Sequence, residues 1–293
     1  MEKKSIAYSP LIVGAMRLGE WGSNYNTTDY EAFIESCINL GLTDFDHADI
    51  YGGHTTEIEF GKVMAVRPDL RGKIEVTTKC GIMYPSDNRP SIKVKHYDSS
   101  KDHIINSVNT SLKNLQVGKI KLLLIHRPDY LMEVDEIAEA FTQLRDSGKV
   151  DYFGVSNFTP TQFQLLADVF PLVNNQVEFS LTHPFPLMDE ASYYSRRKQV
   201  KITAWSPLGG AKALDPTENP VLSTCLAAMS AKYNCTADQV LYAWICKHPL
   251  GIIPVTGTSR VSRIKIALTA IDIELSREDW YELLEKSLGH KVA

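Results

Sequence analysis

The chain lacks the features that mark membrane-spanning, secreted and nucleic-acid-binding proteins. No apolar run approaches the roughly 18–20 residues that span a bilayer, and the N-terminus has no apolar stretch typical of a signal peptide. The 31 basic and 35 acidic residues include no dense basic run, so the charge gives no reason to expect nucleic acid or an anionic membrane as a partner. These absences predict a cytoplasmic protein.

Cysteine is scarce and scattered. The five cysteines are odd in number and form no CxxC pair, which argues against a disulfide framework and against a structural zinc site. We expect reduced thiols that are mostly buried. The sequence also contains no HExxH motif or similar cluster of metal ligands, so no metal is expected.

What the chain does contain is enough apolar sequence for a large core. It has 293 residues, of which 44% are hydrophobic and 23% are charged, a balance typical of globular proteins. Pro/Gly-rich linkers, low-complexity tracts and shifts of composition are all missing, so no domain boundary is indicated. We therefore expect a single domain over residues 1–293.

Short β-rich runs alternate with longer helix-like stretches along the whole chain. The expected strands are residues 12–16, 43–47, 74–79, 121–126, 152–155, 175–179, 201–205 and 251–254. The expected helices are residues 30–40, 56–64, 101–115, 134–147, 160–169, 189–198, 220–232, 237–247, 261–269 and a last helix up to residue 288. This α/β alternation requires a parallel sheet, and eight βα units in a chain of this length fit a closed (β/α)8 TIM barrel.

The ends of the first and last helices carry their own signals. Thr28 and Glu31 have the spacing of a capping box, which predicts the start of the first helix. Gly41 suits the end of that helix. Ser276 is the expected N-cap of the last helix.

The alternative fold is an open, Rossmann-like sheet. Such a sheet carries a GxGxxG motif directly after its first strand. Gly14, Gly19 and Gly22 follow the first expected strand at the wrong spacing. The barrel is therefore favoured.

Polar side chains gather at the C-terminal ends of the expected strands, where a barrel of this kind has its chemistry. Successive side chains of a strand alternate between its two faces. By that alternation Asp46, Lys79 and His126 all point into the barrel mouth. Tyr51 reaches the same mouth from the loop after the second strand, whereas His47 falls on the outward face and is expected to be structural.

These four residue types have a chemical logic together. A free tyrosine has a pKa of about 10 and is a poor acid near neutrality. An ammonium such as that of Lys79 stabilises the phenolate and lowers this pKa, and Asp46 keeps the lysine charged and oriented. His126 can donate a hydrogen bond that orients a substrate oxygen. The group suits protonation of a carbonyl oxygen that gains negative charge as hydride arrives.

A series of segments carries a resemblance to a known family. The segments are residues 41–52 (GLTDFDHADIYG), 78–81 (TKCG), 123–129 (LLIHRPD), 154–158 (GVSNF), 175–179 (NQVEF), 204–209 (AWSPLG) and 254–258 (PVTGT). In this order they resemble the aldo-keto reductase superfamily over nearly the whole chain, and most closely its bacterial oxidoreductases of the YdhF-like type. The resemblance implies NADPH-dependent reduction of aldehydes or ketones, which are small-molecule carbonyl substrates, with formation of NADP+.

The resemblance also implies roles for the residues at the barrel mouth. Asp46, Tyr51, Lys79 and His126 form the catalytic tetrad, with Tyr51 as the general acid. The residues expected to hold the nicotinamide carboxamide are Ser156, Asn157 and Gln176. Trp205 is expected to stack on the nicotinamide ring, and the residues expected beside it are Met16, Arg17 and Asp46.

The loops after the last two strands are expected to hold the phosphates. Glycines in the first loop allow close backbone approach to the pyrophosphate, and free N–H groups at the start of the following helix form an anion site. Two arginines there suit a 2′-phosphate, which favours NADPH over NADH. The residues concerned are Ser206, Pro207, Leu208 and Gly209 in the first loop and Gly257, Thr258, Ser259, Arg260 and Arg263 in the second.

Two other functions stay open at this point. The first is a redox-sensing regulatory protein that binds the nucleotide and turns over slowly. The second is a barrel hydrolase or isomerase without nicotinamide, which the absence of a metal-ligand cluster disfavours. The polar loop of residues 84–98 either borders the substrate pocket or is an unstructured surface loop, and His54 is expected to be an exposed loop residue.

Overall fold

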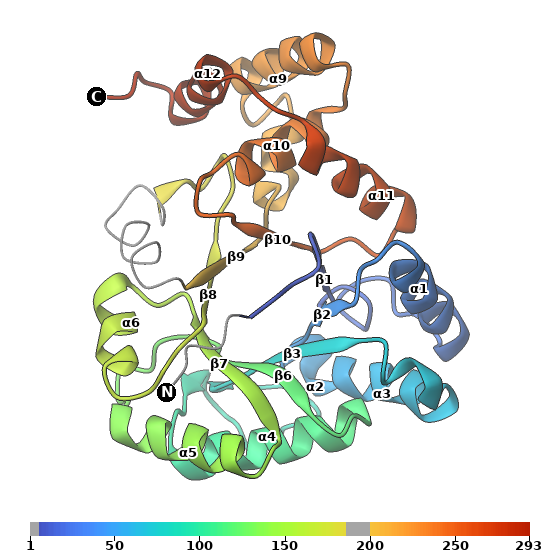
Figure 1. Ribbon diagram of the computed structural model, residues 1–293, viewed down its shortest axis with the longest axis vertical. Coiled ribbons are helices and arrows are strands. Elements are labelled where there is room, and N and C mark those ends of the chain that lie inside the picture. Colours follow the sequence, from blue (N-terminus) through green and yellow to red (C-terminus); the bar gives the residue numbers. More distant parts are fainter. Residues whose placement is uncertain (1–5, 186–199) are drawn as a thin grey trace.

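A closed barrel of eight parallel strands forms the centre of the computed structural model, which describes residues 6–185 and 200–293 (Figure 1). The strands follow one another around the barrel in chain order, and β1 pairs with β10 to close it. They are β1 (Ile12–Gly14), β2 (Asp44–Asp46), β3 (Glu75–Cys80), β6 (Ile120–Ile125), β7 (Val150–Ser156), β8 (Asn174–Glu178), β9 (Lys201–Trp205) and β10 (Ile253–Thr256). The predicted (β/α)8 barrel is therefore confirmed.

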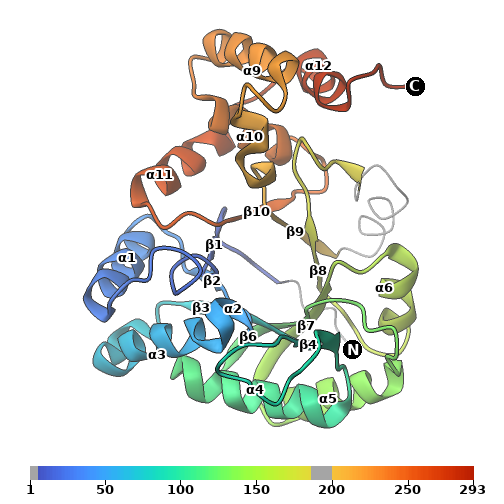
Figure 2. The same ribbon diagram turned by 180° about the vertical axis from the view of Figure 1, so that it is seen from behind.

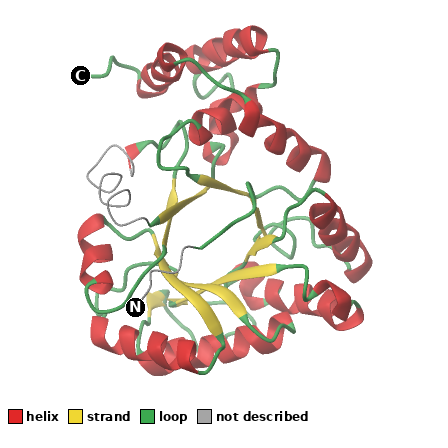
Figure 3. Ribbon diagram, viewed as in Figure 1, coloured by secondary structure: helices red, strands yellow, loops and turns green. Residues whose placement is uncertain are grey.

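Helices surround the barrel and cover the outward faces of its strands (Figure 3). The α-helices are α1 (Thr27–Asn39), α2 (Tyr51–His54), α3 (Thr56–Val66), α4 (Lys101–Leu115), α5 (Val134–Asp146), α6 (Pro160–Ala167), α9 (Pro220–Tyr233), α10 (Ala237–Cys246), α11 (Val261–Thr269) and α12 (Arg277–Leu288). Short 3-10 helices occupy Pro68–Leu70, Gly209–Leu214 and Ala270–Asp272. In the view from behind, α9 and α12 lie side by side, farther from the barrel than α10 (Figure 2). The helix expected over residues 189–198 lies outside the described residues.

Two short strands lie outside the barrel. They are β4 (Ile82–Met83) and β5 (His96–Tyr97), which pair in antiparallel fashion. No strand was expected in this stretch. Strands of two residues are too short to show a hydrophobic period, so only their pairing reveals them.

The first helix starts earlier than the sequence predicts. Its N-cap is Asn26, whose side-chain oxygen accepts a hydrogen bond from a backbone N–H of the first turn at 2.9 Å. The capping box predicted for Thr28 and Glu31 is wrong, because Glu31 instead binds the guanidinium of Arg67 at 2.6 Å. At the other end of the chain Ser276 does cap α12, as predicted.

The two faces of a barrel strand pack into different parts of the core. On β6, Leu123 points outward and packs among side chains of α4 and α5. Leu124 points inward, where it packs with Ile6. Both leucine side chains are fully buried. The two-residue alternation assumed in predicting the site is therefore confirmed on this strand.

Gly61 marks a close approach between α3 and the end of α4. A Cβ at this position would lie 1.8 Å from the carbonyl oxygen of Asn114. We expect Gly61→Ala to destabilise the protein by about 1–3 kcal/mol, because the clash outweighs the roughly 1 kcal/mol by which a helix favours alanine over glycine. Chemical denaturation measures the change. The control is Gly118→Ala, where a Cβ meets nothing within 4 Å; equal stability of both variants would contradict the close approach.

All five cysteines are free, as their scattered spacing predicts. Cys37, Cys80 and Cys225 are buried, and Cys235 and Cys246 are partly buried. None of the helices in the described ranges is long and apolar enough to cross a membrane.

Candidate active site

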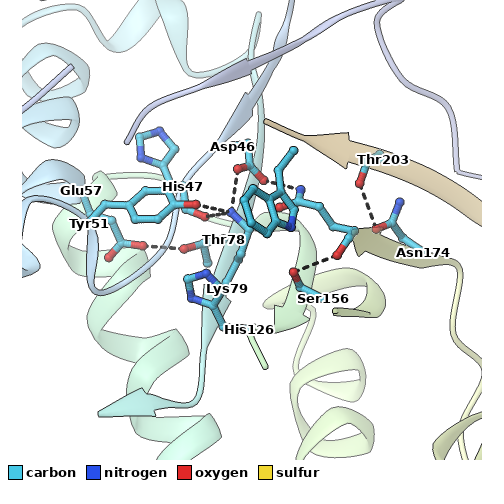
Figure 4. Close-up of polar contacts among 12 residues, drawn as sticks. Asp46, His47, Tyr51, Glu57, Thr78, Lys79, His126, Ser156, Asn174 and Thr203 are labelled. Atoms are coloured by element: carbon cyan, nitrogen blue, oxygen red, sulfur yellow. Dashed lines mark hydrogen bonds and ion pairs between the residues drawn. The ribbon is translucent and has the colours of Figure 1, made fainter. Parts of the chain in front are cut away.

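Lys79 lies at the centre of the predicted site, on the inward face of β3. Its side chain is only 1% exposed, and its ammonium donates three hydrogen bonds (Figure 4). The acceptors are Asp46 Oδ2 at 2.6 Å, the backbone oxygen of His47 at 2.8 Å and Tyr51 Oη at 3.0 Å. An ammonium has three protons, so these contacts use its full donor capacity and compensate for the burial of its charge.

Tyr51 is brought to Lys79 by a tight turn after β2. The next two residues, Gly52 and Gly53, have φ angles of 59° and 62°, in the left-handed region that favours glycine. A Cβ on Gly52 would also lie 2.6 Å from Oγ1 of Thr56. The Tyr51 hydroxyl accepts from Lys79, so its own proton is free to be donated in another direction.

Burial and charge act in opposite directions on the Tyr51 hydroxyl. Burial raises its pKa, Lys79 lowers it and Asp46 raises it, and the net direction is upward from the ordinary value. Lys79 thus lowers this pKa, as predicted, but burial, which the prediction did not include, outweighs the ammonium. Burial alone lowers the pKa of Lys79, but Asp46 and Tyr51 outweigh it, so the pKa of Lys79 is raised. Both groups hold their protons at neutral pH.

His126 joins this group from the end of β6. Its ring meets the Tyr51 ring edge to face, with centroids 6.0 Å apart and planes at 79°. Burial lowers the pKa of His126 well below its ordinary value, and Lys79 and Arg127 lower it further. The imidazole is therefore neutral, with one N–H to donate. The structure thus brings all four predicted residues together, since Asp46 and Tyr51 bind Lys79 and His126 faces Tyr51.

A chain of hydrogen bonds extends from Asp46 across β7, β8 and β9. Gln176 Nε2 donates to Asp46 Oδ1 at 2.9 Å, so Lys79 and Gln176 bind the two oxygens of one carboxylate. Ser156 Oγ donates to the backbone oxygen of Gln176 at 2.9 Å, and Asn157 Nδ2 donates to Ser156 Oγ at 2.8 Å. Trp205, at the end of β9, donates from its indole Nε1 to Asn157 Oδ1 at 2.9 Å. The four residues therefore form one connected group with Asp46.

The loop after β9 turns sharply at its glycines. Gly209 and Gly210 have φ angles of 59° and 67°. A Cβ on Gly209 would lie 2.0 Å from Thr182 Oγ1, whereas a Cβ on Gly210 would meet nothing within 4 Å. The loop thus packs closely against Thr182 at Gly209, whereas the space beside the backbone at Gly210 is open. The predicted residues before the glycines are Ser206 and Leu208, which are half-buried, and Pro207, which is buried.

The segment after β10 leads into α11. Its Ser259 is anchored by the loop after β1, because Ser23 Oγ and Tyr25 Oη donate to its Oγ and backbone oxygen, each at 2.6 Å. Arg260 and Arg263 are exposed, and neither forms an ion pair with a residue in the described ranges. The other predicted residues of this segment are Gly257, which is exposed, and Thr258, which is half-buried.

Met16 and Arg17 follow β1, which ends at Gly14 rather than at residue 16 as predicted. Both side chains are exposed. The structure therefore places them in the loop at the barrel mouth, and neither side chain forms a hydrogen bond or ion pair with the four central residues.

Residues 84–98 fold back towards the turn that carries Tyr51. The Tyr84 ring packs edge-on against Trp21 at 5.6 Å, and the Trp21 ring lies 6.4 Å from that of Tyr51. Asn88 Nδ2 donates to the backbone oxygen of Gly53 at 2.9 Å. Of the two interpretations of this loop, the structure supports the one in which it borders the site.

His54 differs from its prediction as an exposed residue. It is half-buried, and its ring nitrogens bind the backbone oxygens of Asp49 at 2.9 Å and Tyr84 at 3.2 Å. These two oxygens belong to segments far apart in the sequence, so periodicity gives no sign of the contact. His54 thereby ties the loop to the turn after β2.

Two contributions to the site were not predicted from the sequence. The His47 side chain is fully buried on the outward face, as predicted, with its ring 4.6 Å from that of Phe60, but its backbone oxygen is a ligand of Lys79. The guanidinium of Arg127 lies 5.5 Å from the centroid of the Trp205 ring. The signal that could have indicated Arg127 was its position directly after His126.

Known proteins resemble this chain over nearly all of its length. The model of the aldo/keto reductase family matches residues 10–287. The chain is 41% identical to the uncharacterized oxidoreductase YcsN of Bacillus subtilis (strain 168), covering 99% of this chain and 97% of that protein. It is 39% identical to the oxidoreductase YdhF of Escherichia coli (strain K12), with 97% and 95% covered. It is 38% identical to a 6-dehydroglucose reductase of Agrobacterium fabrum, with 97% and 96% covered.

Solved structures agree on the fold. The thermostable aldo-keto reductase Tm1743, in complex with the inhibitor epalrestat, superposes with a TM-score of 0.80 at 24% identity, covering 97% of each chain. An aldo/keto reductase from Klebsiella pneumoniae in complex with NADP and acetate gives a TM-score of 0.78 at 23% identity, covering 94% of this chain and 90% of that one. The family resemblance drawn from the sequence is confirmed. The chain belongs to the aldo/keto reductase family and is a nicotinamide-dependent oxidoreductase.

Proposed function

We propose that this protein reduces the carbonyl group of aldehydes or ketones to alcohols, with NADPH as the reductant. The observation that carries the proposal is the set of three hydrogen bonds donated by the buried ammonium of Lys79, one of them to Tyr51. An ammonium held charged beside a protonated phenol is suited to deliver a proton to an oxygen that gains negative charge.

Tyr51 is the proposed general acid. Its oxygen accepts from Lys79, which leaves the phenolic proton available to a substrate oxygen. Loss of that proton creates a phenolate, and the ammonium 3.0 Å away stabilises it. Asp46 keeps Lys79 charged and oriented. His126, which is neutral, donates its N–H to the same substrate oxygen and sets its direction.

The residues along β7, β8 and β9 fit the nicotinamide end of the cofactor. They present amide and hydroxyl groups that match the donors and acceptor of a carboxamide, and an indole face that matches the ring. The proposed contacts are Ser156, Asn157 and Gln176 to the carboxamide, Trp205 to the ring, and Met16, Arg17 and Asp46 beside them. When bound there, the reduced nicotinamide supplies the hydride.

The loops after β9 and β10 fit the phosphates. A Cβ at Gly210 or Gly257 would meet no atom within 4 Å, so backbone N–H groups there can be approached closely. Arg260 and Arg263 stand at the start of α11 without an ion-pair partner in the described part of the chain. Their guanidinium groups suit the 2′-phosphate that distinguishes NADPH from NADH. The other proposed phosphate contacts are Ser206, Pro207, Leu208, Gly209, Thr258 and Ser259.

Changing both Arg260 and Arg263 to methionine is expected to weaken NADPH binding by about tenfold, because a charge-assisted hydrogen bond at an exposed site is partly screened by water. NADH lacks the phosphate, so its binding is expected to change little. Quenching of tryptophan fluorescence measures both dissociation constants. Arg277→Met, at the exposed start of α12, is the matched control. Equal losses for the two nucleotides would exclude a 2′-phosphate site here.

Multiple turnover tests the function itself. The purified protein, supplied with NADPH and a simple aldehyde, is expected to oxidise many equivalents of NADPH and to release the alcohol. Tight NADPH binding with at most one turnover would instead favour a redox-sensing regulatory protein. A protein that binds neither nucleotide would contradict the proposal.

A further inference from the structure

Arg127 stands at the barrel mouth as the residue after His126, where β6 ends. Its side chain is half-buried, and its guanidinium carbon lies 5.5 Å from the centroid of the Trp205 ring. An aromatic face holds the planar guanidinium in a limited range of orientations. Its charge reaches the site, because Arg127 lowers the pKa values of both Tyr51 and His126.

The charge of Arg127 is not neutralised within residues 6–185 and 200–293. No carboxylate there lies within 4.0 Å of the guanidinium, and none of its N–H groups donates a hydrogen bond to a described residue. Two more deeply buried cations do have such partners: Lys79 binds Asp46, and Lys121 binds Asp44, each at 2.6 Å. A partly desolvated guanidinium without an acceptor is a ready site for an anion.

The charged groups around His126 are all positive, as Arg127 is. The charged groups that act on its ring are Lys79, Arg127 and Lys95, and all three are cations. Lys95 is exposed, on the loop that borders the site. Of these cations, Lys79 is already occupied by Asp46, His47 and Tyr51. Arg127 is therefore the cation best placed to bind a charged group of a substrate whose carbonyl lies at Tyr51.

We propose that Arg127 is a specificity-determining residue, which selects carbonyl substrates that carry a carboxylate by binding that carboxylate with its guanidinium. This inference rests on the proposed function, since it assigns the substrate class of the same site. The carboxylate takes no part in the redox step and is unchanged in the product. Its role is to hold the carbonyl group within reach of Tyr51 and His126.

Pairs of substrates that share an aromatic ring and an aldehyde but differ in charge test the assignment. 3-Formylbenzoate and 4-formylbenzoate place a carboxylate at two positions relative to the aldehyde, and their methyl esters remove the charge but keep the ring and the aldehyde. For at least one pair we expect kcat/KM for the acid to exceed that for the ester by about tenfold to a hundredfold, the range of a hydrogen bond to a charged group. The difference is expected mainly in KM.

Variants assign the preference to the guanidinium. Arg127→Met is expected to bring the acid-to-ester ratio close to one, and Arg127→Lys to keep part of it. The matched control is Arg145→Met, because Arg145 also lies 5.5 Å from an aromatic ring, that of Phe170, but on α5. This control is expected to keep the full ratio. A purely structural role of Arg127 under Trp205 would lower both rates together and leave the ratio unchanged, which would overturn the proposal.

Binding provides a readout that does not depend on turnover. Calorimetric titration with 3- and 4-(hydroxymethyl)benzoate, the products, is expected to give about tenfold weaker binding to Arg127→Met than to the unaltered protein. Faster reduction of both esters than of both acids by the unaltered protein would overturn the assignment of Arg127 alone. Failure to reduce any of the four aldehydes would overturn the proposed function, and this assignment with it.

Discussion

Replacing Tyr51 by phenylalanine is expected to lower kcat for carbonyl reduction by at least about a hundredfold, since proton transfer from a positioned acid contributes roughly 10²–10⁴-fold. The variant keeps the ring that meets Trp21 and His126 and loses only the hydroxyl that accepts from Lys79. Because burial raises the pKa of the Tyr51 hydroxyl, this hydroxyl carries its proton at neutral pH. Phenylalanine offers no proton donor in its place. Steady-state rates of NADPH oxidation with a simple aldehyde measure the loss.

Two controls separate loss of the acid from loss of the site. Tyr51→Phe is expected to bind NADPH as tightly as the unaltered protein does, measured by quenching of tryptophan fluorescence. Tyr97→Phe removes the hydroxyl of another half-buried tyrosine from the same apolar cluster and is expected to keep the rate. Full activity of Tyr51→Phe would exclude Tyr51 as the general acid.

Replacing Lys79 by methionine is expected to lower the free energy of unfolding by about 3–5 kcal/mol, the range for breaking one partner of a buried ion pair. Asp46, which is 2% exposed, is left as a buried carboxylate with Gln176 as its remaining donor. The backbone oxygen of His47 and the hydroxyl of Tyr51 also lose their donor. Chemical denaturation followed by circular dichroism measures the change.

A double variant identifies the unpaired charge as the cause. Lys79→Met combined with Asp46→Asn removes both charges, so it is expected to be about 1–3 kcal/mol more stable than Lys79→Met alone. The amide introduced by Asp46→Asn still offers an oxygen to Gln176, so the neighbouring hydrogen bond can persist. A double variant less stable than the single one would contradict the pairing of these two side chains. Activity of either variant is expected to be lost, because Tyr51 no longer has an ammonium beside it.

Local patterns of the sequence predict most of the barrel. Each barrel strand overlaps its expected range, because a buried strand is a short apolar run between polar turns. Helix ends were less predictable. Thr28 and Glu31 have the spacing of a capping box, yet Asn26 caps α1 and Glu31 binds Arg67, a residue brought near by α3. The spacing of a capping box was therefore misleading here, because Glu31 forms an ion pair with a residue at the end of another helix.

The central group of the site was also predictable, because strand alternation and the common end of parallel strands bring Asp46, Lys79 and His126 to one mouth. The electrostatic balance at Tyr51 was not. A sequence shows that an ammonium is near, and it does not show how much water is excluded. Lys79 lowers the pKa of Tyr51 as expected, but burial has the larger effect, so the net shift is upward.

By itself, the sequence determined the barrel, the family and the residues at its mouth, since each depends on spacing along one strand or on short ordered motifs. Only the tertiary structure decided how those residues are connected. Gln176 and Asp46 lie 130 positions apart and share a hydrogen bond, and Arg127 meets Trp205 across the mouth without a carboxylate partner in the described ranges. Such contacts depend on barrel closure, which brings together strands that are distant in the chain, and the burial and neighbouring charges that follow set the charge state of each group.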